Sequence, residues 1–272
     1  MPELPEVEIA ARQLRRWCAG KAIVRVRVHD KRIVRGGSVA SFRRALTKHE
    51  VVRVDRRGKH VLAELSGGAL WWLHLGMSGK FAWRAPKTKA PRHTRVEVTF
   101  DDGRFCFADM RLFGGTAAGD PAFVREVSHV DSLGPDAWID VRTTDQLMAA
   151  IRETRGPIKV VLMDQKRLAG LGNIHAAEAL FRARIHPEAT ADSLPRPAFV
   201  RLLRGIRAGI KYALAATEAE EVSYMSEGGG NPFRVYGRAG EPCPRCRQPI
   251  ASRRLGGRNT FFCPKCQRKD GR

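Results

Sequence analysis

The chain has 272 residues, which is long enough for two domains or for one large domain with a small stabilised module. Its 49 Lys and Arg residues outnumber 28 Asp and Glu residues, and the net charge of +21 favours nucleic acid as a partner, with solubility as the alternative explanation. No stretch has the ~18 apolar residues of a membrane span, and the acidic N-terminus lacks the apolar core of a signal peptide. We therefore expect an intracellular, cytoplasmic protein without membrane contact.

The N-terminal half predicts one helix followed by short strands. Apolar residues recur at three- and four-residue steps over 5–18, which indicates an amphipathic helix with Cys18 as a buried apolar residue. From residue 22 valines alternate with arginines, as in a strand, and 38–47 is a candidate short helix. Further strands are expected at 51–55, 60–65, 69–75, 95–100 and 104–108. This pattern predicts an antiparallel sandwich or barrel for roughly residues 1–130.

The residue pattern changes at Gly134-Pro135, and over the next ninety residues it predicts helices. We expect them at 144–153, from Pro157 to 164, from Asn173 to 181, and at 196–217, with Pro157 as a first residue and Asn173 as a cap. A glycine-rich turn joins the second helix to the third. Helix N-termini at such a turn can bind phosphate through free N–H groups, although a plain helical hairpin is the alternative.

Four cysteines near the C-terminus have the spacing of a metal site. They form two C-x-x-C pairs separated by sixteen residues: Cys243, Cys246, Cys263 and Cys266. Two such pairs complete a tetrahedral set of four thiolates suited to Zn²⁺, and a filled set indicates one structural ion. A redox pair is the competing explanation, but it usually needs one C-x-x-C near a βαβ unit. The metal would hold 247–262 as a basic β-hairpin.

The start of the chain carries unusual chemistry. If Met1 is removed, the terminus is the secondary amine of Pro2, followed by the carboxylate of Glu3. An α-amino group titrates near pH ~8, so a useful fraction is unprotonated and nucleophilic. A neighbouring carboxylate can move protons. The alternative is an ordinary helix start, where Pro and Glu are common.

Five motifs together resemble the formamidopyrimidine-DNA glycosylase family. They are Pro2-Glu3-Leu4-Pro5-Glu6-Val7-Glu8, Arg57-Gly58-Lys59, His74-Leu75-Gly76-Met77-Ser78-Gly79, Gly170-Leu171-Gly172-Asn173-Ile174 and the four cysteines. The resemblance implies an α+β multidomain fold. Its expected parts are an N-terminal β-sandwich catalytic domain with an N-terminal helix (1–133), a helical helix-two-turns-helix DNA-binding domain (134–225), a loop (226–240) and a zinc-finger β-hairpin (241–272).

The resemblance also implies roles for individual residues. The expected catalytic residues are Pro2, Glu3, Lys59 and Arg258, and Glu6 would lie near the lesion. The expected DNA contacts are His74, Met77, Arg111, Phe113, Lys159 and Asn173. Met and Phe can intercalate where a base is extruded, and Arg can bond the orphaned base. From sequence alone, Met77 and Phe113 would be core residues, and Arg258 a solvated turn residue.

Three segments depart from the family pattern. The family's Asp-Pro-Arg-Arg-Phe-Gly is replaced by a stretch with Met110 and Leu112, and Arg95 stands where a second histidine is common. The segment 221–232, which in the family closes over the flipped base, is shortened and rewritten. A truncated lid resembles the endonuclease VIII branch and would favour ring-opened purines or oxidised pyrimidines over 8-oxoguanine.

We therefore expect a monomeric base-excision-repair enzyme that acts on double-stranded DNA. It would excise formamidopyrimidines, and 8-oxoguanine as a further substrate, through a Schiff base on Pro2, and then cut the strand by β,δ-elimination. An endonuclease VIII-like enzyme for oxidised pyrimidines and a non-catalytic zinc-containing DNA-binding protein are the alternatives.

Overall fold

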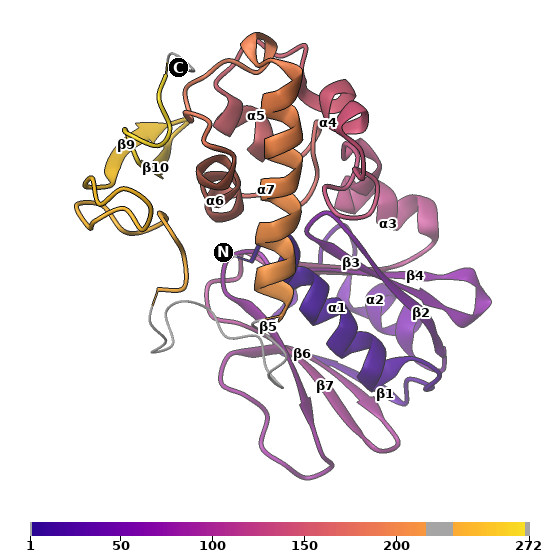
Figure 1. Cartoon of the computed structure of the whole chain (residues 1–272). Coiled ribbons are helices and arrows are strands. Elements are labelled where there is room, and N and C mark those ends of the chain that lie inside the picture. Colours follow the sequence, from indigo (N-terminus) through magenta and orange to yellow (C-terminus); the bar gives the residue numbers. More distant parts are fainter. Residues whose placement is uncertain (1, 216–230, 270–272) are drawn as a thin grey trace. The chain divides into compact units, whose positions relative to one another are not determined.

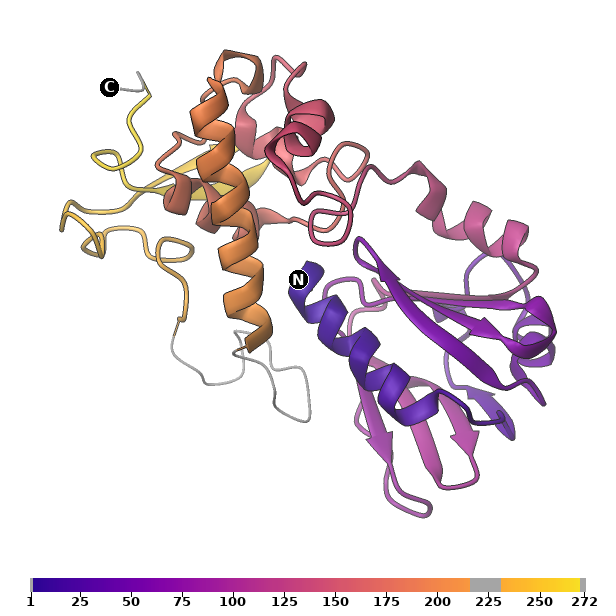
Figure 2. The ribbon, with the colours of Figure 1, turned by 45° about the vertical axis from the view of Figure 1, so that its right-hand side comes forward.

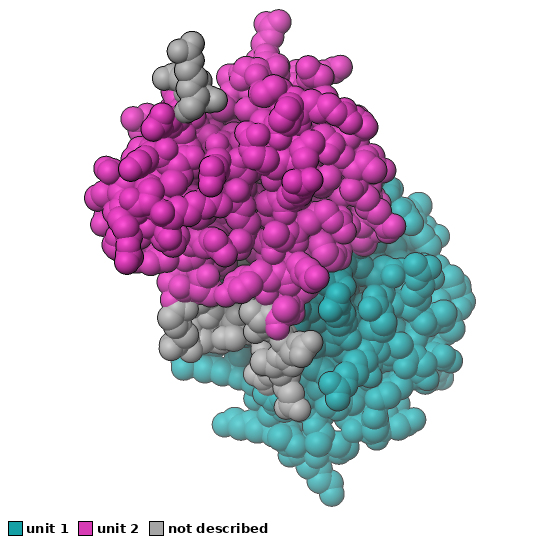
Figure 3. All heavy atoms as spheres, viewed as in Figure 1, with its two compact units in different colours: residues 1–132, 217–224 teal, residues 133–216, 225–272 magenta. Residues whose placement is uncertain are grey.

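The computed structural model describes residues 2–215 and 231–269, which fall into two compact units (Figure 3). Among these residues, unit 1 contains 2–132 and unit 2 contains 133–215 and 231–269. The expected capping segment 221–232 lies outside the described residues except for its last two positions, and so does the glycine run at 228–230. Among the described helices, none combines the length and the apolar character that a membrane span needs.

Unit 1 is built from two four-stranded antiparallel sheets (Figure 1). The first has the order β1-β6-β7-β5 and consists of Arg25–Val28, Thr94–Phe100, Gly103–Asp109 and Gly79–Arg84. The second has the order β2-β3-β4-β8 and consists of Val51–Arg57, His60–Leu65, Leu70–His74 and Gly115–Gly119. Together with the helical and zinc-finger parts of unit 2, these sheets confirm the predicted fold class.

Aromatic side chains join the two sheets of unit 1. Trp71 on β4 meets Phe105 on β7 edge to face, with ring centroids 5.5 Å apart, and Phe81 on β5 adds a second edge contact to Phe105 at 5.0 Å. All three side chains are buried, and large aromatic residues of this kind contribute most to core stability. The helix α1 (Leu4–Cys18) packs against strands of both sheets, as Figure 2 shows. The short helix α2 (Val39–Leu46) contacts β8 and β1.

Three elements of unit 1 have no counterpart among the predicted ones. The strand β8 was hidden by its glycines and alanines, which have low strand propensity, and it pairs with β4. The strand β5 had a readable signal, since Phe81 and Trp83 alternate along it. The helix α3 (Pro121–Ser128) had a readable signal, since Asp120 caps it by accepting a hydrogen bond from Ala122 N at 2.8 Å and Pro121 is its first residue.

Unit 2 consists of four α-helices and a hairpin among its described residues. They are α4 (Thr144–Ile151), α5 (Ile158–Met163), α6 (Asn173–Ala183), α7 (Arg196–Ala215), β9 (Ala251–Leu255) and β10 (Arg258–Phe262). Pro157 is the N-cap of α5 rather than its first residue. The prediction that Asn173 caps α6 is wrong: Gly172 is the N-cap, and Asn173 begins the helix with its amide engaged in tertiary hydrogen bonds.

Candidate functional site

The first helix of unit 1 begins at the expected catalytic residues. Glu3 and Glu6 form a capping box, in which Glu3 N donates to Glu6 Oε2 at 2.8 Å and the Glu3 carboxylate accepts from the Glu6 backbone. Pro2 and Glu3 are buried, and Glu3 is only 1% exposed. In the full-length chain the nitrogen of Pro2 is an amide because Met1 precedes it, and an amide nitrogen is not a nucleophile. Any chemistry at Pro2 therefore requires removal of Met1.

Lys59 lies at the tip of a two-residue hairpin turn between β2 and β3. Gly58 takes φ +57, a backbone conformation that favours glycine and allows this tight turn. Arg56 ties the turn to α1: its Nη1 donates to Gly58 O at 2.9 Å, and its Nε donates to Glu8 Oε2 at 2.9 Å. Burial raises the pKa of Glu8, but its bonds to Arg56 and Arg12 outweigh this effect, so the pKa lies below its usual value. Glu8 is therefore a charged anchor for the Lys59 turn.

Three aromatic rings, those of His60, Trp72 and His74, contact one another next to Lys59. Trp72 Nε1 donates to His60 Nδ1 at 2.9 Å, and the His60 and His74 ring centroids are 5.0 Å apart. Burial is the main cause that lowers the pKa of His60 to about 3 and that of His74 to about 4, and the positive charge of Lys59 is a further cause. Both rings are thus neutral near pH 7. Because His74 Nδ1 accepts from Gly76 N at 3.2 Å, its Nε2 carries the proton and can donate to a phosphate oxygen.

The predicted intercalating residues are exposed, so their core interpretation is wrong. Met77 is 39% exposed and Phe113 is 57% exposed, although large apolar side chains are normally buried. The Arg111 guanidinium lies 5.4 Å from the centre of the Phe113 ring, a cation–π contact. Unit 1 therefore presents the three residues Met77, Arg111 and Phe113, here called the wedge residues, on two adjacent turns.

These two turns are in direct backbone contact. At Gly76, φ is +60, and a Cβ would lie 2.3 Å from the carbonyl carbon of Phe113, so only glycine fits. The second turn is folded around Asp109, which is fully buried. Its Oδ2 accepts from Gly114 N at 2.8 Å, and its Oδ1 accepts from Ser78 Oγ at 2.5 Å and from Arg111 N at 3.2 Å. The carboxylate of Asp109 thus connects the turn that carries Met77 to the one that carries Phe113.

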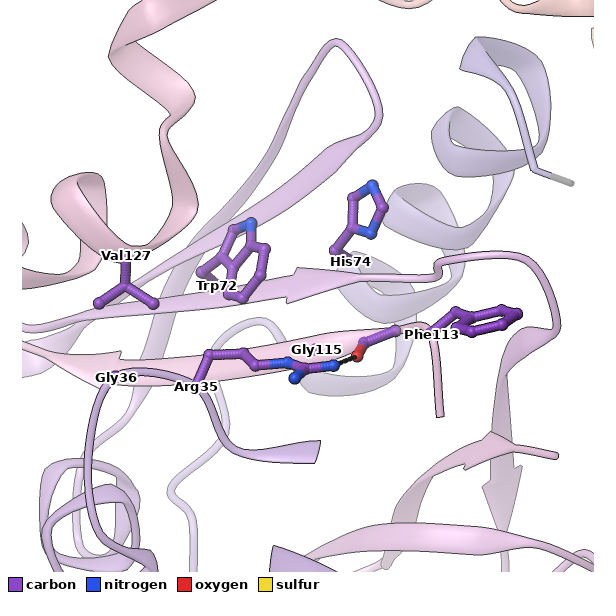
Figure 4. Close-up of a pocket in the computed structure, with 8 residues that line it drawn as sticks. Arg35, Gly36, Trp72, His74, Phe113, Gly115 and Val127 are labelled. Carbon is purple, nitrogen blue, oxygen red and sulfur yellow. Dashed lines mark hydrogen bonds between the residues drawn. The ribbon is translucent and has the colours of Figure 1, made fainter. Parts of the chain in front are cut away.

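A pocket of about 450 Å³ lies behind Phe113 (Figure 4). Trp72 and His74 project from the same face of β4 at this pocket, and Arg35 extends along Gly115 toward the loop. Arg35 was not a predicted site residue. The pocket is therefore lined on one side by the wedge residue Phe113 and on the other by Arg35, Trp72 and His74.

In unit 2, Lys159 is fully buried rather than presented to solvent. Its Nζ donates to Asn173 Oδ1 at 2.6 Å, to Thr260 Oγ1 at 2.6 Å and to Asn259 O at 3.3 Å. Asn173 also donates from Nδ2 to Asn259 O at 3.1 Å. The predicted phosphate contact of Lys159 is thus not part of the described geometry, because its ammonium points inward and joins α5, α6 and β10. A positioning role replaces it as our proposal.

Arg258 lies where the sequence predicts it, at the tip of the C-terminal hairpin. It is the first residue of β10, pairs with Leu255 across the turn Gly256-Gly257, and is exposed. The next two residues along β10 accept from Lys159, so the buried ammonium fixes the strand that carries Arg258.

The four C-terminal cysteines converge on one point of unit 2. Their sulfur atoms all lie within 4.8 Å of one another, with Cys246 and Cys263 at 3.4 Å and Cys243 and Cys266 at 4.0 Å. These separations fit a tetrahedral ion with Zn–S bonds of about 2.3 Å. The four thiolates could therefore bind one structural zinc ion. Cys243 and Cys263 also pack in a small core with Phe181 of α6, which attaches the finger to the helices.

Sequence reasoning missed the residues that support the predicted ones. Three residues support the turns that carry the predicted site residues: Asp109, Arg56 and Arg35. None of them belongs to a sequence motif that would have indicated this role. Asp109 could have been suspected, because a carboxylate followed by a glycine-terminated turn often accepts backbone N–H groups. No local signal relates Arg35 to a loop almost eighty residues away.

Comparison with known protein families accounts for nearly the whole chain. Three family descriptions match in order: "Formamidopyrimidine-DNA glycosylase N-terminal domain" over residues 1–116, "Formamidopyrimidine-DNA glycosylase H2TH domain" over 133–223, and "Zinc finger found in FPG and IleRS" over 240–268. A formamidopyrimidine-DNA glycosylase of Pelotomaculum thermopropionicum is 35% identical over 275 residues, covering 98% of this chain and 99% of the relative. The Thermus thermophilus protein of that name is 37% identical over 277 residues, with 98% of each chain covered.

Solved structures agree with these sequence relatives. MutM in complex with DNA containing carbocyclic 8-oxo-G is similar with a TM-score of 0.86 and 30% identity, covering 98% of this chain and all (100%) of the other. Lactococcus lactis Fpg in complex with DNA containing N7-benzyl-Fapy-dG has a TM-score of 0.87 and 30% identity over the same shares. Sequence, fold and zinc-finger geometry together show that this chain belongs to the formamidopyrimidine-DNA glycosylase family.

Proposed function

We propose that this protein is a DNA glycosylase and abasic-site lyase of base excision repair that acts on oxidised bases in double-stranded DNA. The observation that carries the proposal is the exposed set of wedge residues on two rigid turns of unit 1, in a chain whose family is established. A base inside a duplex cannot be reached by an enzyme, so it must be extruded and its place filled. Exposed Met and Phe side chains beside an Arg suit that task.

The covalent chemistry is assigned to the start of the chain. After removal of Met1, the Pro2 nitrogen attacks C1′ of the flipped nucleotide while the base leaves with the electrons of the glycosidic bond. Glu3, which lies next to Pro2, assists proton transfer at the sugar. The adduct opens at the C1′–O4′ bond, with a proton going to O4′, and becomes an iminium. Loss of a proton from C2′ then drives departure of the 3′ phosphate by β-elimination, and δ-elimination releases the 5′ phosphate.

The remaining expected residues receive roles that fit their geometry. Lys59 and neutral His74 share one surface of unit 1 and bind phosphate, the first as a cation and the second as a hydrogen-bond donor. In unit 2, Arg258 grips the backbone as an exposed cation. The contact of Asn173 with the backbone stays a proposal, because its amide already bonds Lys159 Nζ and Asn259 O. Lys159 holds both of their elements in position. Glu6 remains near the lesion as a proposal.

The partner of these residues is double-stranded DNA that contains an oxidised base or an abasic site. The structural relatives include Fpg bound to DNA with an abasic site, and a monomer suffices for that kind of complex. Zinc serves a structural purpose in the finger. We place the protein in the cytoplasm, with the nucleoid DNA. The four-part domain division stays a prediction.

Borohydride trapping tests the covalent step. The protein, with removal of Met1 verified by mass spectrometry, is mixed with duplexes that contain formamidopyrimidine, 8-oxoguanine, thymine glycol or an abasic site. We expect a covalent product and a nicked strand, fastest for the ring-opened purine. A matched variant with one alanine inserted before Pro2 keeps every side chain but turns the Pro2 nitrogen into an amide and moves the free α-amine one residue away, so it should trap and nick far more slowly.

The outcomes separate the candidate functions. Fastest cutting of thymine glycol would assign the protein to oxidised pyrimidines instead. Binding of every duplex without trapping or nicking would leave a zinc-containing DNA-binding protein without catalytic function. Trapping at the wild-type rate in the alanine-insertion variant would refute the role of Pro2.

A further inference from the structure

We propose that Arg35 is a positioning residue that holds the wedge residue Phe113 in its extended, exposed orientation. The inference rests on the proposed function, in which Phe113 fills the place of an extruded base. Arg35 Nη2 donates to Gly114 O at 2.7 Å, the bond drawn in Figure 4, and to Leu112 O at 3.3 Å. The two carbonyl groups belong to the residues before and after Phe113, so one guanidinium nitrogen brackets the position of the wedge.

The backbone of Arg35 is itself fixed to the second sheet. Arg35 N donates to Thr116 O at 2.9 Å, and Val34 forms a parallel bridge with Thr116 on β8. The side chain then reaches the loop along Gly115, where a Cβ would lie 2.9 Å from Arg35 Cγ and 3.0 Å from Arg35 Nε. Because Gly115 on β8 has no side chain, Arg35 can pass over it and reach the loop 110–114, which carries Arg111 and Phe113.

The loop needs such an external support. Leu112 adopts φ +58, a conformation that is unfavourable for a non-glycine residue. The proline that the family carries before the wedge arginine is Met110 here, so the backbone lacks that restriction. Arg95 donates from Nε to Asp109 O at 2.8 Å, which holds the first half of the loop. Arg35 is the corresponding support for the second half.

Phe113 depends on this backbone support because little else restrains its ring. Its side chain is 57% exposed, and its ring contact among the described residues is with Arg111, which is itself exposed. A pocket lies behind the residue rather than a packed core. When the carbonyl groups on either side are released, the ring can turn toward that pocket and lose its wedge orientation.

The test compares Arg35→Met with Arg44→Met, which removes one exposed cation from α2 at a place away from the loop. Three quantities are measured: amide hydrogen exchange of the loop in the free protein, the fluorescence of 2-aminopurine placed beside the lesion, and the slope of log K against log salt. We expect Arg35→Met alone to speed exchange at the Gly114 amide and to slow base unstacking, each about tenfold, as for loss of one charge-assisted hydrogen bond. Its salt slope should match that of Arg44→Met.

A double-mutant cycle with Phe113→Ala completes the design. If Arg35 acts through Phe113, Arg35→Met should slow unstacking no further in the Phe113→Ala background. Undiminished slowing there, or unchanged loop exchange with a salt slope smaller than that of Arg44→Met, would overturn the proposal and make Arg35 a simple phosphate contact. A wild-type protein that cuts no lesion would refute the proposed function instead, and hydrogen exchange would still decide whether Arg35 holds the loop.

Discussion

Replacing Asp109 by Asn tests whether a single buried carboxylate organises the wedge residues. Asp109 is 0% exposed, and its two oxygens accept from Gly114 N on one side and from Ser78 Oγ and Arg111 N on the other. An asparagine has the same shape but only one acceptor oxygen. Whichever way the amide is turned, its NH₂ group faces an N–H donor, either that of Gly114 or that of Arg111.

The expected cost follows from these bonds. With the asparagine oxygen toward Gly114 N, the charge-assisted bonds on the other side are lost, worth about 1.5–3 kcal/mol, while Arg111 N keeps Ser78 Oγ as a second acceptor at 3.2 Å. We therefore expect Asp109→Asn to lower the free energy of local unfolding of the loop by about 2 kcal/mol. Ser78→Ala is the matched control, because it removes one of the three donors and leaves the carboxylate bonded to Gly114 N, so the protection of the Gly114 amide should stay near that of the wild type.

Native-state hydrogen exchange at the Gly114 and Arg111 amides measures both changes, and urea unfolding of the whole protein shows that the variants fold. Asp109→Asn should also slow base unstacking, since Phe113 loses its fixed backbone. If the Asn variant protects these two amides within about 0.5 kcal/mol of the wild type, the reasoning is wrong, and the loop must be held by its other contacts.

Three further predictions concern the rest of the chain. Chelation of zinc should make the hairpin 251–262 susceptible to trypsin, and added zinc should restore its resistance, because only Thr260 and Phe262 are buried in its two strands. Resistance to trypsin that survives chelation would show that packing alone holds the hairpin. Lys159→Met should lower the free energy of local unfolding of the hairpin 251–262 by about 2 kcal/mol, as measured by hydrogen exchange, and should leave the salt dependence of DNA binding unchanged. A slope of log K against log salt that is smaller by about one would instead show that Lys159 contacts a phosphate directly. Because the pKa values of His60 and His74 are lowered in the folded protein, the unfolded chain takes up more protons as the pH falls. The contribution of these two histidines to stability is therefore fully present above about pH 6.5 and is lost as the pH falls toward 4. His74→Gln should flatten the dependence of the urea midpoint on pH between about pH 7 and 4.5, and an unchanged curve would show that His74 is accessible to water.

The sequence predicted those features of this protein that depend on neighbouring residues. Helix period fixed α1 to within one residue, and alternating valines located the strand β1. The paired cysteines predicted the metal centre, because each pair needs only a local turn to present two thiolates. Such features are set by backbone propensity and side-chain periodicity, which a linear sequence displays directly.

Tertiary structure alone decided which residues support the site. The strand β8, whose glycines and alanines have weak strand propensity, exists because β4 offers it a partner. The sequence could not show that Asn173 would bond Lys159 rather than cap its helix, since that choice depends on a strand some eighty residues later. Nor could it show that Met77 and Phe113 remain outside the core, because exposure is a property of the packed chain. Long-range packing determines where the buried carboxylate of Asp109 points, and that carboxylate holds the turns that carry Met77, Arg111 and Phe113.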